Sequence, residues 1–270
     1  MIEKLSRKKL LNSNCTIPII KKVPENSTVI IGHAYGNKTE YILKIDQMEI
    51  ANNAKSFLLK NKSKIKRVIF TGDVFNKPSK EKWDILYDSF SPYFEIIISP
   101  GNHDIGGATE GIKFSTAQNE LFEEYISQKQ TIEMPFLLKD QDFNLIIDDS
   151  NNRKNSLNEV TSLLKKNKIK DQVILLRHHS NIGEDNKVYS PNSINRFALK
   201  KLKVLQKFIE KKLDKYGELF IIYGDSKNTY CYNHGKITHI WSGIGGTSND
   251  KILLLKEGKI YLYSLKSYTD

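Results

Sequence analysis

The sequence has few cysteines, no long apolar run and no low-complexity stretch. Its two cysteines, Cys15 and Cys231, are distant in the chain and do not make a disulfide framework. No apolar run reaches the ~18–20 residues that a helix needs to span a bilayer. Residues 1–11 are polar and basic, and no apolar segment of the kind found in secretory signals follows them. These absences predict reduced cysteines, no membrane span and a soluble protein of the cytoplasm.

Positive charge is in excess, because 42 Lys and Arg residues face 31 Asp and Glu residues and give a net charge of +11. A basic surface attracts phosphate-bearing partners, including nucleic acid and anionic small molecules. The basic residues are nevertheless spread along the chain, without a basic arm or an interleaved aromatic pattern. General use of lysine at the surface is therefore the simpler interpretation, and nucleic acid is a weakly supported partner.

Short apolar runs predict strands that are buried on both faces. They cover residues 28–31, 68–71, 95–99, 144–147, 173–176 and 219–223. Two further runs, residues 252–255 and 260–263, flank Glu257-Gly258 and predict a hairpin. Apolar stripes with helical spacing cover residues 50–58, 83–90 and 198–213. This alternation of strands and helices predicts a layered α/β fold.

The expected organisation is a single domain of residues 1–270, because neither an internal repeat nor a linker is found in the sequence. Residues 1–25 form an N-terminal extension of that domain. Residues 104–135 contain glycines and then a helical pattern, and they are the expected cap over a site.

Polar residues that can bind metal follow five of the six strands directly. The segments are 33–37, 72–73, 101–104, 177–179 and 224–227. An isolated Gly-Asp is usually a turn, because both residues favour turns. Five such segments at strand ends predict a binding site there, since ligands of layered α/β folds bind at this position.

These segments resemble, in order, the metal-binding motifs of the calcineurin-like metallophosphoesterases. That family runs Asp-x-His, Gly-Asp, Gly-Asn-His-Asp/Glu, a histidine after a strand, and Gly-His-x-His. Gly-Asn-His-Asp at residues 101–104 matches its motif completely, Gly72-Asp73 matches a shorter one, and His178 is similar to the single histidine. The resemblance covers nearly the whole chain and implies a four-layer αββα sandwich with metal bound at the strand ends.

The resemblance also implies roles for these residues. Asp73 would bridge two metal ions, while Asn102 and His178 would both ligate one of them. His103 would protonate the leaving oxygen or stabilise the transition state, and Asp104 would orient its ring. Carboxylate, amide oxygen and imidazole suit divalent Mn, Fe or Zn. Such ions supply a metal-bound hydroxide near neutral pH.

The first and last motifs depart from the family pattern. His33-Ala34-Tyr35 stands in place of Asp-x-His, and Asp225 and Lys227 stand in place of the two histidines of Gly-His-x-His. Asp225 and His33 can still ligate a metal, whereas Tyr35 ligates rarely and protonated Lys227 has no lone pair to offer. The sequence therefore predicts one divalent ion, with the Lys227 ammonium in place of a second. Two ions are the alternative.

Four residues near this site are expected to bind substrate, namely Lys227, Tyr35, Asn37 and His179. His179 is also an alternative to His178 as the metal ligand. His234 and His239 are interpreted as structural, although either one is an alternative replacement for the missing motif histidine.

The favoured function is a metal-dependent phosphoesterase or phosphatase that acts on a phosphorylated small molecule. The first alternative is a catalytically altered relative that binds a phosphorylated ligand or a protein partner, which the four departures from the motifs support. The second alternative is a nuclease-like member, which only the net charge of +11 supports.

Overall fold

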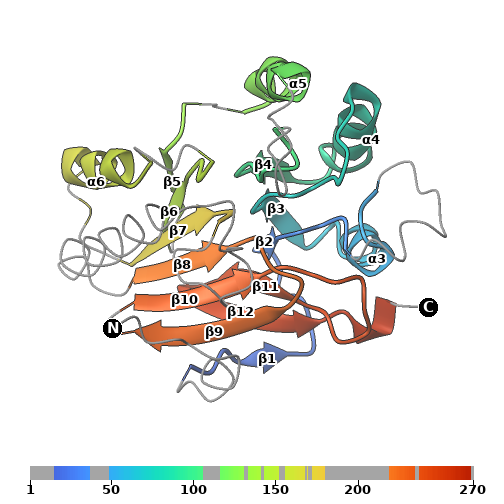
Figure 1. The fold of residues 1–270 in the computed structure, drawn as a ribbon. Coiled ribbons are helices and arrows are strands. Elements are labelled where there is room, and N and C mark those ends of the chain that lie inside the picture. The colour runs from blue at the N-terminus through green and yellow to red at the C-terminus, as the bar shows by residue number, and fades with distance from the viewer. Residues whose placement is uncertain are drawn as a thin grey trace, which may run out of the picture.

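Two six-stranded β-sheets form the centre of the molecule (Figure 1). The computed structural model describes residues 15–36, 49–105, 116–130, 133–140, 143–151, 156–167, 169, 172–179, 219–234 and 237–268. Sheet 1 consists of β1 (Ile19–Ile20), β12 (Lys259–Ser264), β11 (Lys251–Lys256), β2 (Ser27–Ile31), β3 (Ile65–Phe70) and β4 (Glu95–Ile98), in that order. Sheet 2 consists of β5 (Phe136–Lys139), β6 (Asn144–Ile147), β7 (Val173–Arg177), β8 (Leu219–Tyr223), β10 (Ile237–Ser242) and β9 (Thr229–His234), in that order.

Parallel strands make up the middle of both sheets. In sheet 1, β2, β3 and β4 run parallel, and β11 and β12 follow as an antiparallel pair. In sheet 2, β6, β7, β8 and β10 run parallel, while β5 and β9 are antiparallel edge strands. Because parallel strands end on the same side of a sheet, the loops that follow them are brought together at one edge.

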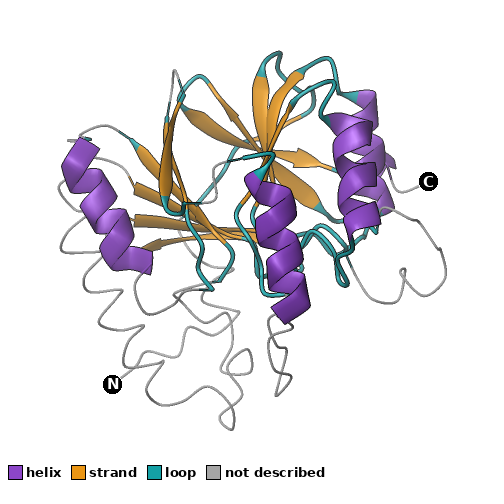
Figure 2. Ribbon diagram, turned by 90° about the horizontal axis from the view of Figure 1, so that it is seen from above, coloured by secondary structure: helices purple, strands orange, loops and turns teal. Residues whose placement is uncertain are grey.

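Alternating side chains of the strands fill three apolar layers. Ile30 of β2 and Ile174 of β7 belong to the layer between the two sheets. Val29 of β2 faces the opposite way, toward the helices α3 (Asn52–Lys60), α4 (Lys80–Phe90) and α5 (Thr116–Ser127). The outer face of sheet 2 packs on α6 (Ser156–Asn167) through residues that include Ile146. Figure 2 shows α6 on one side of the strands and the helices α3 and α4 on the opposite side. The predicted αββα sandwich is confirmed.

The helix α4 has the apolar face that the sequence predicts. Trp83, Leu86, Tyr87 and Phe90 are its buried residues. The hydroxyl of Ser79 accepts a hydrogen bond from the N–H of Lys82 at 3.3 Å and caps the first turn. The helix α3 likewise buries part of the predicted stripe over residues 50–58. The third predicted helix, over residues 198–213, lies outside the described residues.

The described part of the expected cap packs beside α4. Phe122 of α5 contacts Trp83 with ring centroids 6.2 Å apart. The hydroxyl of Tyr125 donates a hydrogen bond of 2.7 Å to Asp84 Oδ1. Residues 106–115 of the expected cap lie outside the described residues.

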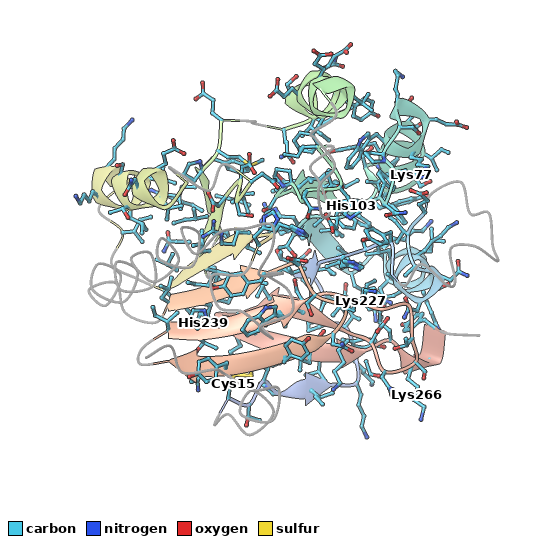
Figure 3. All side chains as sticks on the ribbon, viewed as in Figure 1. Cys15, Lys77, His103, Lys227, His239 and Lys266 are labelled. Atoms are coloured by element: carbon cyan, nitrogen blue, oxygen red, sulfur yellow. A yellow bond between two sulfur atoms is a disulfide. The ribbon has the colours of Figure 1, made fainter. Side chains whose placement is uncertain are left out.

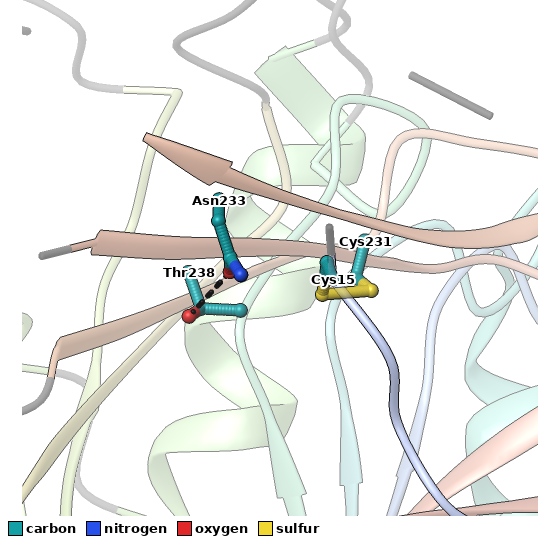
Figure 4. Close-up of a disulfide and its surroundings, with 4 residues drawn as sticks. All are labelled: Cys15, Cys231, Asn233 and Thr238. Atoms are coloured by element: carbon teal, nitrogen blue, oxygen red, sulfur yellow. Dashed lines mark hydrogen bonds between the residues drawn. A yellow bond between two sulfur atoms is a disulfide. The ribbon is translucent and has the colours of Figure 1, made fainter. Parts of the chain in front are cut away.

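Cys15 and Cys231 form a disulfide, with their Cα atoms 5.7 Å apart (Figure 4). The expectation of two reduced, unpaired cysteines is therefore wrong. Distance along the chain misled it, because β1 lies beside β12 at the edge of sheet 1 and brings Cys15 to the edge strand β9 of sheet 2. Among the described residues, none of the helices has the length and apolarity that crossing a membrane requires.

Candidate metal centre

The loops after the parallel strands of the two sheets are joined to each other at the edge where the strands end. Thr71 follows β3, and its Oγ1 lies 2.9 Å from the Ser242 hydroxyl at the end of β10. The hydroxyl of Ser99, which follows β4, donates a hydrogen bond of 2.8 Å to the carbonyl of Asp148. Each bond joins one sheet to the other. The predicted segments from both sheets therefore lie against one another.

The side chains of Asp73, Asn102 and His178 converge at this edge. His178 Nε2 lies 3.2 Å from Asn102 Oδ1 and 3.3 Å from Asp73 Oδ1. His178 Nδ1 lies 3.0 Å from the carbonyl oxygen of Thr71, which can only accept a hydrogen bond. Nδ1 therefore carries the hydrogen, and the lone pair of Nε2 faces two oxygen atoms. This arrangement is repulsive unless a positive charge lies among the three atoms.

The pKa of His178 expresses the same preference for positive charge. Burial by itself lowers this pKa, but the carboxylates of Asp73 and Asp225 and the carbonyl of Thr71 raise it, and the net shift is upward. A bound divalent cation satisfies the same negative field without a proton. A hydrogen bond from the other ring nitrogen to a backbone carbonyl is the usual way in which proteins orient a ligating histidine.

Asp104 holds the backbone around Asp73. Its Oδ2 accepts hydrogen bonds from the N–H groups of Asp73 (2.8 Å) and Gly101 (2.9 Å), and its Oδ1 accepts one from Val74 (2.9 Å). The side chain of Asp104 is completely buried. Burial, together with the charge of Asp73, raises the pKa of Asp104 to about 6, against the hydrogen bonds from Gly101 and Val74 that lower it. Asp104 therefore fixes the loop from which Asp73 projects.

The ring of His103 is oriented by a backbone carbonyl. Its Nδ1 lies 3.0 Å from the carbonyl oxygen of Asn76, and its backbone N–H donates to Asp73 Oδ1 at 3.1 Å. The resemblance implied that Asp104 orients this ring, but the carboxylate of Asp104 faces the backbone of residues 73, 74 and 101 instead. Asp104 acts on the ring through the loop that carries Asn76. His103 is half-buried and leaves Nε2 for contact with a ligand.

Two glycines leave room for the converging side chains. A Cβ on Gly72 would lie 2.5 Å from His178 Nδ1, and Gly72 also has a positive φ of 89°. A Cβ on Gly101 would overlap the backbone nitrogen and Oδ1 of Asp73. The neighbouring side chains and backbone thus require glycine at both positions, and at Gly72 the positive φ requires it as well.

Asp225 and His179 lie beside His178. Ligand atoms of these three residues all lie within 4.8 Å of one another. The backbone N–H of Asp225 donates to the carbonyl of His178 at 2.9 Å, which ties the loop after β8 to the end of β7. Asp73, Asn102, His178 and Asp225, the four ligands predicted for one ion, are called the first half of the site below.

His33 and Tyr35 are buried next to the first half. Their rings lie 4.2 Å apart, and the Tyr35 ring meets the His103 ring edge-on at 5.5 Å. Burial lowers the pKa of His33 to about 4, against the raising effect of Asp73, and its Nδ1 has no hydrogen-bond partner. Burial, with the charge of Asp73, raises the pKa of Tyr35 well above its ordinary value. At neutral pH both side chains are uncharged.

Lys227 belongs to the same neighbourhood but is exposed. Its charge is one of the influences that lower the pKa of His33. Figure 3 labels both Lys227, whose loop follows β8, and His103, whose loop follows β4. Lys227, His33 and Tyr35 are called the second half of the site. The predicted substrate residue Asn37 lies outside the described residues.

Sequence reasoning missed the groups that orient the predicted residues. The carbonyls of Thr71 and Asn76 hold the rings of His178 and His103, and the Ser150 hydroxyl lies 3.0 Å from His179 Nδ1. A backbone carbonyl has no sequence signature, whereas Ser150, at the end of the loop after β6, could have been found by its place at a strand end.

The other two histidines lie on the edge pair of sheet 2. His239 is buried, and its Nδ1 lies 2.9 Å from the hydroxyl of Tyr223, in keeping with the structural interpretation. His234 is the last residue of β9, and its side chain lies outside the described part of the structure.

The donors of the first half fit a divalent metal ion. They comprise two carboxylates, one amide oxygen and one imidazole whose lone pair faces the oxygens. This mixture of oxygen and nitrogen suits Mn, Fe or Zn. The second half offers one imidazole, a protonated phenol and an ammonium group, and it is the poorer place for a second ion.

Several solved structures are similar to this chain. The GAP50 structure, titled the anchor in the inner membrane complex of Plasmodium, has a TM-score of 0.54 at 14% identity and covers 90% of this chain and 85% of that chain. Phosphopantetheinyl hydrolase of Mycobacterium tuberculosis has a TM-score of 0.43 at 10% identity and covers 83% of this chain and 92% of that chain. The structure of Vps29 of Entamoeba histolytica complexed with zinc has a TM-score of 0.38 at 14% identity and covers 88% of this chain and 92% of that chain. No curated protein matches the chain.

The likeness to GAP50 shows the fold alone, because so few residues are identical. The family model for calcineurin-like phosphoesterases matches residues 44–260, which is most of the chain and includes both halves of the site apart from His33 and Tyr35. The chain therefore belongs to the calcineurin-like phosphoesterase family.

Proposed function

We propose that this protein is a metal-dependent phosphoesterase that hydrolyses a phosphate ester of a small molecule at the strand-end site. Members of the family are hydrolases of phosphate esters that bind divalent metal ions. The observation that carries the proposal is the convergence of Asp73 Oδ1, Asn102 Oδ1 and His178 Nε2, with the Nδ1–H of the imidazole engaged by the carbonyl of Thr71. This geometry favours a bound cation. His103 lies next to the same site, because its backbone N–H donates to Asp73 Oδ1.

The first half of the site would hold one divalent ion through Asp73, Asn102, His178 and Asp225. When bound, such an ion supplies Lewis acidity toward a phosphoryl oxygen and lowers the pKa of water. His103 would exchange a proton with the leaving oxygen through Nε2, because its Nδ1 is engaged by the carbonyl of Asn76. Histidine is suited to this role near neutral pH.

The second half would bind the phosphate without a second ion. The Lys227 ammonium supplies a positive charge for a phosphate oxygen, and a charge-assisted hydrogen bond of this kind is stronger than a neutral one. The raised pKa of Tyr35 keeps its phenol protonated, so that it can donate a hydrogen bond to the same group. His33, which is neutral, adds no charge that would compete with Lys227. Asn37 is the other proposed substrate contact.

A panel of phosphomonoesters and phosphodiesters assayed with Mn²⁺ and with Zn²⁺ tests the activity. Metal-dependent turnover is expected in the wild type and is expected to disappear in Asp73→Asn. Metal analysis of the purified protein should find one tightly bound ion per chain. Two tightly bound ions would contradict the assignment of Lys227 to the place of a second metal.

The second candidate function is a relative that binds a phosphorylated ligand or a protein partner without turnover. It is favoured by the replacement of family ligands at His33, Tyr35, Asp225 and Lys227. It predicts tight metal binding and phosphate binding with no hydrolysis in the whole panel. The intact His103, with its ring held by Asn76, favours the enzyme over this candidate.

A further inference from the structure

We propose that His179 is an additional ligand of the metal ion in the first half of the site, which no motif of the family assigns. The inference rests on the proposed metal centre but not on catalysis. Its consequence is an ion held by His178, His179 and Asp225 together, two of them adjacent histidines that follow β7.

The position of His179 makes this ligation feasible. Successive side chains of a strand point to opposite faces, but β7 ends at Arg177, and the next two residues lie in a bend. As a result, the rings of His178 and His179 lie on the same side, with centroids 4.7 Å apart and planes at 80°. Two imidazoles at a large angle can point their nitrogens at a common ion.

The spacing of the donor atoms agrees with a shared ion. Zinc binds imidazole nitrogen at about 2.0–2.1 Å and carboxylate oxygen at about 2.0–2.2 Å in a tetrahedral arrangement, so its donor atoms are about 3.3–3.6 Å apart. The ligand atoms of His178, His179 and Asp225 all lie within 4.8 Å of one another. A contraction of at most about 1.5 Å between donor atoms, which rotation of the side chains can supply, closes the site around an ion.

Ser150 orients His179 for this role. The buried Ser150 hydroxyl accepts a hydrogen bond of 2.9 Å from the backbone N–H of His179 and lies 3.0 Å from Nδ1 of the same residue. A hydroxyl oxygen has two lone pairs, so it can accept from the backbone N–H and from Nδ1–H together. In this tautomer Nε2 carries the lone pair. Ser150 then does for His179 what the carbonyl of Thr71 does for His178.

A second imidazole has a chemical consequence for the choice of metal. Nitrogen ligands favour Zn²⁺ and Co²⁺ over Mn²⁺ and Mg²⁺, which prefer oxygen. Zn²⁺ and Co²⁺ are therefore the probes for the test, because loss of the His179 nitrogen should affect these two ions most.

The decisive variant is His179→Asn. The side-chain amide of asparagine can take the place of Nδ1–H beside Ser150, but it removes Nε2. We expect His179→Asn to raise the Kd for Zn²⁺, measured by competition with a chelating dye, by about 10–100-fold. We also expect it to change the visible spectrum of the Co²⁺-loaded protein. His239→Gln, which alters a buried histidine of the structural pair with Tyr223, should leave both measurements unchanged.

Unchanged zinc affinity and an unchanged cobalt spectrum in His179→Asn would overturn the proposal. Ser150→Ala keeps the metal donors but removes the orienting hydroxyl, and it should weaken zinc binding to a smaller degree. If His179→Asn does not fold, wild-type zinc affinity in Ser150→Ala would overturn the proposal in its place.

Failure of the phosphoesterase proposal can be told apart from failure of this one. A wild type that binds zinc through His179 but hydrolyses no ester contradicts only the catalytic proposal. Metal-dependent hydrolysis that survives in His179→Asn with unchanged zinc affinity contradicts only the His179 proposal.

Discussion

Single residues with positive φ angles shape the loops that carry the ligands. His33 has a φ of 49° and Asp73 one of 55°, although neither is glycine. A non-glycine residue in this region costs on the order of 1–3 kcal/mol, and surrounding contacts must hold it there. For Asp73, the carboxylate of Asp104 provides those contacts through three backbone N–H groups of the same loop and of Gly101. Stability and ligand placement are therefore coupled at this position.

Gly101→Ala should damage the metal site directly. The added Cβ would overlap Asp73 N and Oδ1, so the carboxylate must move away from His178. We expect a fall in stability of about 1–3 kcal/mol, as is usual for overpacking, and a loss of zinc affinity of at least about tenfold. Urea unfolding and zinc titration measure the two effects. Gly258→Ala, where a Cβ meets nothing within 4 Å, should leave zinc affinity unchanged.

His33 should make the metal-free protein less stable in acid. Its pKa is lowered to about 4 in the folded state from 6.5, so the unfolded chain binds the proton more tightly. The contribution of His33 to the free energy of unfolding is fully present above pH 6.5 and is lost as the pH falls toward 4. Between pH 7.5 and pH 5 the loss is about 2 kcal/mol, from 1.36 kcal/mol per pKa unit.

His33→Gln removes this contribution. Urea unfolding of the metal-free wild type and of His33→Gln at both pH values gives the comparison. The other titrating groups affect both proteins alike. The change in the free energy of unfolding between the two pH values therefore differs between the two proteins by the contribution of His33. An equal change in the free energy of unfolding in both proteins would show that His33 takes up a proton in the folded state as readily as in the unfolded chain.

The residues proposed as ligands could be predicted from the sequence, but their orientation could not. Strand ends and motif order predicted Asp73, Asn102, His178 and Asp225, and the structure places each of the other three close to His178. The ring of His103 is set by the carbonyl of Asn76, which any residue would carry at that position. Motifs record side chains, and backbone acceptors are visible only after folding.

At the scale of elements, strands that form continuous apolar runs were predictable, and strands interrupted by polar residues were not. The parallel strands β2, β3, β4, β6, β7 and β8 all lie within or close to the predicted apolar runs. The interior strand β10 and its edge neighbour β9 carry histidine, tyrosine, asparagine and threonine, so neither forms a continuous apolar run. Their pairing depends on a register with β8 that local pattern does not encode.

The glycine-rich turn between β10 and β11 is organised from within the protein. The buried carboxylate of Asp250 accepts hydrogen bonds from the N–H groups of Gly245 (3.1 Å), Gly246 (2.7 Å) and Thr247 (2.8 Å). It also accepts one from Asn53 Nδ2 of α3 at 2.9 Å. Asp250 thus occupies the place that a phosphate takes in a glycine-rich cradle, and the turn joins sheet 1 to α3.

Asp250→Ala should loosen this junction without affecting the metal. Several buried N–H groups lose their partner, and each one left unsatisfied costs about 1–3 kcal/mol. We expect the free energy of unfolding to fall by at least about 2 kcal/mol, measured by urea unfolding, with zinc affinity close to that of the wild type. Asn249→Ala, at the exposed neighbouring position, is the matched control. A similar loss in both variants would assign the effect to the turn as a whole.

At the scale of the whole molecule, covalent and polar links hold the two sheets together in different places. Arg67 of β3 pairs with Asp140, which follows β5, at 2.9 Å, and Lys66 reaches the same carboxylate at 2.8 Å. The hydroxyl bonds of Thr71 and Ser99 join the sheets at the metal end. The disulfide joins their edges at β1 and β9. The apolar layer between the sheets is thus bounded by specific contacts on several sides.

Removal of the disulfide should lower stability substantially. The bond spans a sequence separation of 216 residues, and the chain-entropy model assigns to a loop of this size up to about 5 kcal/mol. Cys231→Ser should therefore unfold at lower urea concentration than the wild type, and a reducing agent should destabilise the wild type but not the variant. Identical unfolding midpoints for the wild type and Cys231→Ser would show that the link between Cys15 and Cys231 does not stabilise the fold.

The same bond provides a test of the proposed cytoplasmic location. Cytosolic reductants keep most thiols reduced, and structural disulfides persist mainly in oxidising compartments. A cytoplasmic protein predicts that Cys15 and Cys231 are both alkylated in freshly lysed cells. Protection of both cysteines until a reductant is added would instead assign the protein to an oxidising compartment.

Because Cys15 and Cys231 are 216 positions apart in the sequence, the disulfide closes a long part of the chain into a covalent ring, which leaves β10, β11 and β12 outside it. A protease that cuts once anywhere between them opens the ring but releases no fragment. Nicked protein will therefore run as one species on a non-reducing gel and separate into two pieces only after reduction. The proposed metal ligands from Asp73 to Asp225 all lie inside this ring, so a single cleavage leaves them attached to one another.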